Sequence, residues 1–275
     1  MGPKSFPDLH EITCFRNEVI TQVLCGKNFT FVLTDKNVLY GTGCNIYGVL
    51  GIDDMSHMEE RHYNFTAFVR IPISFHIDRI SCNNSLAVIV ASGNYLGVPP
   101  KSNEHSEKKQ AQTFFWSGGD MSVSGSPIIK QFTPIVDWSM NIKGRVKYLE
   151  SSPTSKFFVI VTEFNRIYFS GVNCSGQFGN GEEKHSFKSL VPLSAGFFPP
   201  FYGIKHVACG TKHTVIVTDC NQLFTSGDNK YFQLGHSCGD KTNTFQKPKI
   251  DFQGTPIKMA KCGSFFTLVY LESMY

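Results

Sequence analysis

Short apolar runs separated by turn residues are the dominant pattern along the chain. Val159-Ile160-Val161 and Val215-Ile216-Val217 are β-branched runs of strand length, typical of strands that are buried on both faces. A second kind of strand begins at pairs such as Leu223-Phe224 and ends at a glycine. Turns such as Asp219-Cys220-Asn221-Gln222 lie between them and contain residues that tolerate left-handed backbone. No long stretch has an apolar period of 3.6 residues, so the sequence predicts an all-β protein.

A phrase that recurs along the chain divides it into units. Its first half is Cys25-Gly26-Lys27-Asn28-Phe29-Thr30, which returns as Cys209-Gly210-Thr211-Lys212-His213-Thr214 and again from Cys262, with looser copies at Cys82 and Ser151. The copies follow one another at intervals of about 55 to 60 residues, apart from a longer second unit. The second half of the phrase runs over residues 43–51, 171–179 and 227–235. A proline follows each of the first four units: Pro72, Pro134, Pro192 and Pro248.

Three or four strands repeated at this interval are the signature of a β-propeller. We expect one repeat domain over residues 1–275, with about five units that form either a closed small ring or an incomplete propeller. Residues 11–15 are expected to form a further strand, and the segment 1–20 can complete the last blade, which would hide open sheet edges. The units are expected near residues 20–72, 77–134, 146–192, 204–248 and 257–271.

The repeated phrases resemble the regulator-of-chromosome-condensation repeat, whose characteristic stretches are Cys-Gly-x-x-His-Thr and Gly-x-Asn-x-x-Gly-Gln-Leu-Gly. The copies at residues 209–214 and 227–235 fit best, although Phe232 replaces one glycine. The resemblance covers roughly residues 20–271 and implies a β-propeller. Propellers of that family commonly have seven blades, whereas this chain has four complete units and a fifth that stops at Leu271.

Composition narrows the class of protein and its location. With 41% hydrophobic, 13% aromatic and 17% charged residues, the chain is neither disordered nor collagen-like. Its net charge of +4 comes without a cluster of basic residues, so we expect no nucleic-acid partner. We expect no membrane association and no secretion, because no apolar segment is long enough for a span and no signal-peptide core begins the chain. Nine cysteines without a C-x-x-C pair favour the reducing cytoplasm or nucleus.

Candidate metal and catalytic residues have simpler structural explanations. Cys25, Cys82, Cys209 and Cys262 occupy equivalent positions in different units, so they should lie blade-widths apart and pack as small buried hydrophobes. His213 fills a slot that is taken by phenylalanine or leucine in other units, which predicts a core histidine bonded to a backbone carbonyl. No motif supplies a nucleophile or a phosphate-binding loop. We therefore expect no catalytic residue, no cofactor and no metal.

The repeated glycines and asparagines are expected to be structural. Asn45, Asn173 and Asn229 should hold equivalent turns by side-chain-to-backbone hydrogen bonds. Gly210 and Gly263 should occupy backbone conformations or close approaches that a Cβ would obstruct.

An insertion in the second unit is the best candidate for contact with a partner. The strands at residues 87–90 and 114–116 should pair as a hairpin, so the polar segment between them is not needed to connect them. Loops on a rigid scaffold often carry recognition. The partner-contact candidates are Lys101, Glu104, His105, Lys108, Lys109, Lys230 and Tyr231.

The repeat and the lack of a catalytic motif favour a non-enzymatic protein-interaction scaffold, and the family resemblance implies that it regulates a small-GTPase pathway. The family resemblance implies an alternative, guanine-nucleotide exchange on a Ran-like small GTPase, which needs no nucleophile and leaves no catalytic motif. Chromatin binding through a basic N-terminal tail ranks last, because residues 1–15 hold only Lys4 as a basic side chain.

Overall fold

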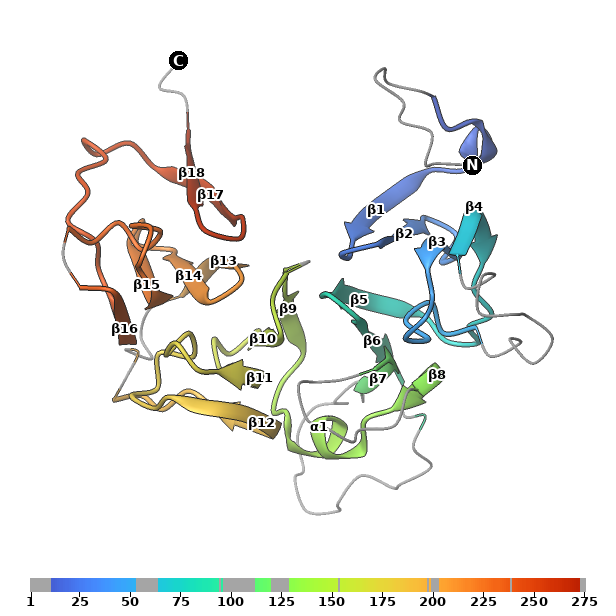
Figure 1. The fold of residues 1–275 in the computed structure, drawn as a ribbon, viewed down its shortest axis with the longest axis horizontal. Helices are drawn as coiled ribbons and strands as arrows, with labels where there is room; N and C mark the ends of the chain where they lie inside the picture. The colour runs from blue at the N-terminus through green and yellow to red at the C-terminus, as the bar shows by residue number, and fades with distance from the viewer. Residues whose placement is uncertain are drawn as a thin grey trace.

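The computed structural model describes residues 11–52, 64–93, 95, 112–119, 129–152, 154–196, 198, 203–237 and 239–272. In this part of the chain, five antiparallel sheets follow one another in sequence order along an arc (Figure 1). We call them units one to five. Unit one contains β1 (Ile20–Cys25), β2 (Phe29–Thr34), β3 (Leu39–Cys44) and β4 (Asn64–Arg70), and unit two contains β5 (Ile77–Cys82), β6 (Leu86–Ser92), β7 (Gln112–Gly118) and β8 (Ile129–Pro134). Unit three contains β9 (Val146–Glu150), β10 (Phe157–Thr162), β11 (Ile167–Asn173) and β12 (Lys184–Pro192). Unit four contains β13 (Ile204–Cys209), β14 (His213–Thr218), β15 (Leu223–Asp228) and β16 (Lys241–Gln246), and unit five contains β17 (Ile257–Cys262) and β18 (Thr267–Leu271).

The predicted propeller architecture with five units is confirmed, and the arc is open. Figure 1 shows β1 at one end and the β17–β18 pair at the other, on either side of a gap. Among the described strands, β1 pairs with β2 alone and β17 pairs with β18 alone. Over the described residues, the five units do not close into a ring.

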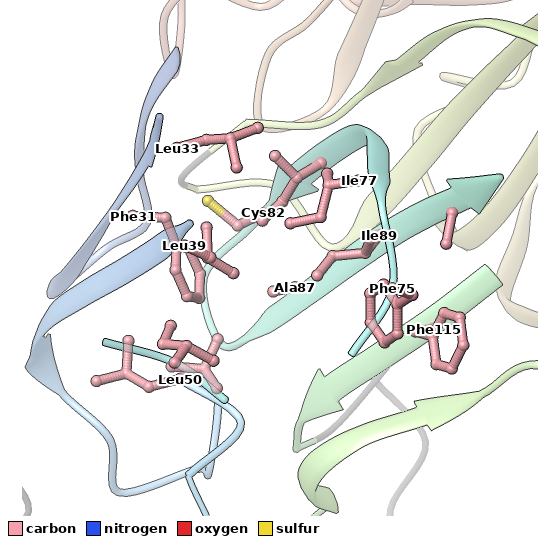
Figure 2. Close-up of a cluster of buried hydrophobic side chains, with 14 of the residues drawn as sticks. Phe31, Leu33, Leu39, Leu50, Phe75, Ile77, Cys82, Ala87, Ile89 and Phe115 are labelled. Atoms are coloured by element: carbon pink, nitrogen blue, oxygen red, sulfur yellow. The ribbon is translucent and has the colours of Figure 1, made fainter. Parts of the chain in front are cut away.

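Neighbouring sheets bury a separate apolar core at each junction. Figure 2 shows the core between units one and two, where Phe31 and Leu39 face Ile77 and Ile89. Each inner sheet packs against two neighbours, so adjacent residues of one strand enter different cores. Val159, for example, belongs to the core shared with unit four, and Ile160 to the core shared with unit two. This explains the apolar runs without alternation that the sequence displays.

The predicted hairpin of unit two is confirmed. Val88 lies opposite Trp116 and Val90 opposite Phe114, and the pairing continues to Ser92 opposite Gln112. The insertion itself, including residues 96–111, lies outside the described residues.

The predicted strand at residues 11–15 is wrong. Thr13–Phe15 forms a single 3₁₀ turn, because Phe15 packs edge-on against Tyr40 at 5.2 Å and against Phe68 at 4.9 Å between ring centroids. The segment thus covers part of unit one. A short helix, α1 (Val136–Asn141), was also not expected, and its Trp138 is buried against Phe114.

Candidate functional site

Apolar side chains are exposed at the free face of unit five. Leu268 and Tyr270 on β18 are 62% and 58% exposed, whereas Val215 and Val217, their counterparts on β14, are fully buried against unit five. No further sheet follows unit five in the described part of the chain. Contiguous exposed apolar surface of this kind is typical of interaction sites.

The turn between β15 and β16 presents two more aromatic side chains beside this face. Asn229 accepts a hydrogen bond through Oδ1 from the backbone N–H of Leu234 at 3.1 Å. Gln233 accepts one from the N–H of Tyr231 at 2.9 Å and donates one to Asp228 at 2.8 Å. Equivalent asparagine bonds, from Phe178 to Asn173 and from Leu50 to Asn45, hold the turns of units three and one, which confirms the predicted role of the three asparagines.

Phe232 has an unusual backbone conformation in this turn. Its φ is +61°, and its side chain is 67% exposed. The corresponding residues of units one and three are Gly48 and Gly176, also with positive φ. A Cβ on Gly176 would lie 2.5 Å from the Cα of Asn243 in β16, so the fourth strand of the next unit excludes a side chain there. In unit five the described residues include no such strand, which leaves room for the ring of Phe232.

Tyr231 connects the turn to unit five. Its ring centroid lies 5.1 Å from that of Phe265, and Lys230 Nζ lies 6.0 Å from the Tyr231 centroid. Phe265 and Phe266 are about half exposed, at 51% and 55%. We call Lys230, Tyr231, Phe232, Phe265 and Phe266 the aromatic surface.

His213 fastens β18 to the turn beneath the aromatic surface. Its Nε2 lies 3.1 Å from Thr267 Oγ1, and this hydroxyl donates to the carbonyl of Gln233 at 2.7 Å. A threonine hydroxyl has one proton to donate, so His213 is the donor through Nε2–H. Burial lowers the pKa of His213 to about 4, which keeps the ring neutral. The predicted core histidine is confirmed, and the Thr267 hydroxyl is one of its partners.

The glycines of the Cys-Gly phrase leave space for the ring three residues later. A Cβ on Gly210 would lie 2.0 Å from His213 Cε1, and one on Gly263 would lie 2.2 Å from Phe266 Cε1. The same glycines donate backbone hydrogen bonds to the carbonyls of His213 and Phe266, at 2.8 and 2.9 Å. The prediction of close approaches at both glycines is confirmed.

Two of the four cysteines in the series are buried, Cys262 is half-buried and Cys25 is exposed. Cys82 and Cys209 are buried, and burial raises the pKa of the Cys82 thiol to about 12. Cys25 is exposed, so the prediction of buried packing is wrong there, because no other described sheet covers β1. The described residues contain no group of three or more histidine, cysteine or acidic side chains that could hold a metal ion.

The structure divides the predicted partner-contact residues into two sets. Lys230 and Tyr231 lie in the aromatic surface. Phe232, Phe265 and Phe266 were missed, although the replacement of a repeat glycine by Phe232 was a visible signal. The remaining candidates, Lys101, Glu104, His105, Lys108 and Lys109, lie outside the described residues. No helix in the described ranges is both long and apolar enough to cross a membrane.

Two family models of the regulator of chromosome condensation (RCC1) repeat match the chain, one over residues 204–233 and one over residues 165–217 and 221–270. Human probable E3 ubiquitin-protein ligase HERC6 is 25% identical over 266 residues, which are 93% of this chain and 22% of that protein. The X-linked retinitis pigmentosa GTPase regulator of Canis lupus familiaris is 30% identical over 113 residues, which are 41% of this chain and 11% of that protein. The chain thus spans less than a quarter of the length of either relative.

The fold has counterparts among solved structures. The crystal structure of human WBSCR16 superposes with a TM-score of 0.73 at 16% sequence identity, covering 96% of this chain and 60% of that one. At this level of identity the similarity concerns the fold alone.

Proposed function

We propose that the chain, whose residues 165–270 match the regulator-of-chromosome-condensation (RCC1) repeat, is a non-catalytic interaction scaffold whose protein partner binds the aromatic surface. The observation that carries this proposal is the exposure of Tyr231, Phe232 and Phe265 on a hydrogen-bonded turn and its neighbouring hairpin. Rigid aromatic side chains beside a basic one are characteristic of binding hot spots.

The geometry of Phe232 supports a role in binding rather than in folding. A bulky residue with positive φ is strained by about 1 to 3 kcal/mol, and its exposed ring makes little compensating contact. Strained residues of this kind cluster at functional sites. A glycine, as in units one and three, would serve the turn better.

We further propose that the partner belongs to a small-GTPase pathway. One relative over part of the chain is named a GTPase regulator. The exposed aromatic side chains of the aromatic surface are typical of surfaces that bind proteins. The alternative is that the chain itself accelerates nucleotide exchange on a Ran-like GTPase. We place this activity in the cytosol or nucleus, where free thiols such as Cys25 and Cys174 stay reduced.

The test is binding and nucleotide release with purified Ran-like, Rab-like and Rho-like GTPases loaded with fluorescent nucleotide. We expect one of them to bind the wild-type chain and Tyr231→Ser to bind about tenfold more weakly. Tyr47→Ser is the matched control, because Tyr47 holds the same turn position in unit one and is 50% exposed. Equal effects of the two variants would refute the aromatic surface as the site. Binding by none of the three GTPases would refute the pathway, and accelerated release would establish the exchange alternative.

A further inference from the structure

Three hydroxyl groups from three different units meet where the first hairpins of units three to five turn. Thr154 lies between β9 and β10, Thr211 between β13 and β14, and Ser264 between β17 and β18. Thr154 Oγ1 lies 2.6 Å from Thr211 Oγ1 and 3.1 Å from Ser264 Oγ. The three hairpin loops therefore come together, and we call these three residues the hydroxyl cluster.

The hydroxyl cluster has more protons than its own contacts use. Each hydroxyl has one proton to donate, and each of the two contacts between oxygens uses one proton. None of the three hydroxyls donates to another group among the described residues, so one proton is left for an acceptor outside the cluster. Thr154 is exposed, and Thr211 and Ser264 are half-buried, so the cluster is accessible from solvent.

Three lysines flank the hydroxyl cluster along the chain. Lys156 and Lys212 hold the same repeat position, directly before the second strand of units three and four. Lys261 is the penultimate residue of β17, three residues before Ser264. All three lysines are exposed, and none forms an ion pair within the part of the chain that the structure describes.

The acidic groups at the ends of the neighbouring strands do not balance the lysines. Asp228 ends β15 and accepts the hydrogen bond from Gln233. Glu150 ends β9, and burial raises the pKa of its carboxyl to about 7, although the charge of Lys261 acts against this rise. Three lysines against Asp228 and a carboxyl that is only about half ionised at neutral pH leave the loops with a net positive charge.

We propose that the hydroxyl cluster and the three lysines bind a phosphate monoester, either on a phosphorylated side chain of another protein or as the free ion. A phosphate monoester carries a charge of about −1.5 to −2 at neutral pH and has three acceptor oxygens. Its charge complements the lysines, and one of its oxygens accepts the remaining hydroxyl proton. A carboxylate has a single charge and two oxygens, so it satisfies fewer of these groups.

Units one and two do not repeat this arrangement. The position of Thr211 is held by Lys27 in unit one and by Asn84 in unit two. Ser85 holds the position of Lys212 in unit two, and its hydroxyl donates to the carbonyl of Gly119 at 2.9 Å. The proposed site also shares no residue with the aromatic surface, so it does not depend on the proposed small-GTPase partner.

The experiment is fluorescence anisotropy of a labelled pentapeptide, Ala-Gly-phosphoserine-Gly-Ala, titrated with the full chain at constant ionic strength. Two further peptides carry serine or glutamate in place of phosphoserine. We expect saturable binding of the phosphopeptide with a Kd below about 1 mM, and binding at least about tenfold weaker for the other two. Inorganic phosphate should displace the phosphopeptide. A Kd of the free ion equal to that of the peptide would assign the site to free phosphate, and a weaker one would assign it to phosphorylated protein.

Variants then locate the site. We expect Lys212→Gln to weaken binding about tenfold and Thr211→Val about fivefold, and Thr211→Ser to retain the affinity because it keeps the hydroxyl. Lys27→Gln is the matched control, because Lys27 is an exposed lysine in the equivalent loop of unit one. Melting temperatures establish that all four variants are folded.

Three outcomes would each overturn the proposal: binding that does not require the phosphate, equal binding of the phosphoserine and glutamate peptides, and equal effects of Lys27→Gln and Lys212→Gln. Because no GTPase is present in these titrations, their outcomes are independent of the test of the aromatic surface.

Discussion

Asn37 and Ile77 lie in different sheets, and Asn37 Oδ1 accepts a hydrogen bond from the backbone N–H of Ile77 at 2.8 Å. Asn37 has a φ of +59° in the turn between β2 and β3, and its Nδ2 donates to the carbonyl of Phe75 at 2.9 Å. The turn of one sheet thus fixes the first strand of the next. Asn165 and Asn221 do the same for Ile204 and Ile257.

The junction between units two and three achieves the same contact with a different residue. Its turn is replaced by the insertion, and Gln112 at the start of β7 accepts the hydrogen bond from the N–H of Val146 at 2.9 Å. All four junctions therefore carry a side-chain amide bonded to the first residue of the following sheet. Such bonds set the angle between sheets more strictly than apolar packing does, because they are directional.

The junction bonds lead to a first prediction. Asn37→Gly keeps the left-handed backbone without strain but removes both side-chain bonds and leaves the Ile77 N–H short of a partner. We expect the free energy of unfolding to fall by about 1 to 3 kcal/mol. Gln253→Gly is the control, since Gln253 also has a positive φ, +52°, but its side chain is exposed to solvent. Equal effects of the two variants in urea titration would contradict the role of the bond.

A second prediction distinguishes two glycines with the same sequence context. Gly210→Val should lower the free energy of unfolding by about 3 kcal/mol or more, because the new side chain meets a ring that is fully buried and bonded to Thr267. Gly263→Val should cost roughly half as much, because the ring of Phe266 is half exposed and can turn away. Thermal melting measures both. A Gly210→Val protein that melts within about one degree of the parent would refute the account.

The sequence predicted the repeat, the turns and the unit-two hairpin because each depends on local patterns. The apolar runs, the asparagine turns and the glycines recur in register, so every copy reinforces the interpretation of the others. What it missed depends on the neighbours of each unit. Cys25 and Cys82 hold equivalent positions of the repeat, yet only Cys82 is buried, because the sheet of unit one packs against β5 and no described sheet packs in the same way against β1.

The aromatic surface was only partly predictable for the same reason. Lys230 and Tyr231 stood out as a basic and an aromatic residue in a turn. Phe265 and Phe266 follow the ordinary repeat pattern, and similar phenylalanines, such as Phe29, are buried. Their exposure follows from the end of the arc, which no local pattern encodes.

A third prediction concerns pH. The folded-state pKa of His213, about 4, lies below its usual value of 6.5, so the folded chain binds fewer protons than the unfolded chain between these values. The contribution of the neutral His213 ring to the free energy of unfolding is complete above about pH 6.5. It is lost as the pH falls toward 4, by up to about 3 kcal/mol. His213→Phe, which copies the residue of units one and five, should lack this loss. Burial raises the pKa of Glu150 to about 7, so Glu150 makes stability change with pH in the opposite direction. This effect is the same in the parent and in His213→Phe. Parallel stability curves from pH 7 to pH 4 would contradict the prediction.

A fourth prediction isolates the backbone strain at Phe232. Phe232→Gly and Phe232→Ala both remove the exposed ring, but only glycine adopts a φ near +61° without strain. We expect the glycine variant to be more stable than the alanine variant by about 1 kcal/mol in chemical denaturation. Both should lose affinity for the partner of the aromatic surface. An alanine variant as stable as the glycine variant would mean that the turn changes conformation to relieve the strain.

The last prediction concerns the insertion of unit two, which carries the partner-contact candidates from Lys101 to Lys109. Ser92 pairs with Gln112, and Tyr95 packs near Phe75 and Phe115 and donates its backbone N–H to Thr113 Oγ1 at 3.1 Å. A replacement of residues 96–111 by Asn-Gly keeps all of these residues, including Gln112 at the junction with unit three. Because the entropy of loop closure changes slowly with loop length, stability should change by only about 1 kcal/mol. If the insertion binds a partner, capture of that partner should be lost while the melting temperature is retained, and Tyr231→Ser should leave capture through the insertion unchanged. Undiminished capture would make the insertion a passive one, and loss of folding would show that residues 96–111 support the hairpin.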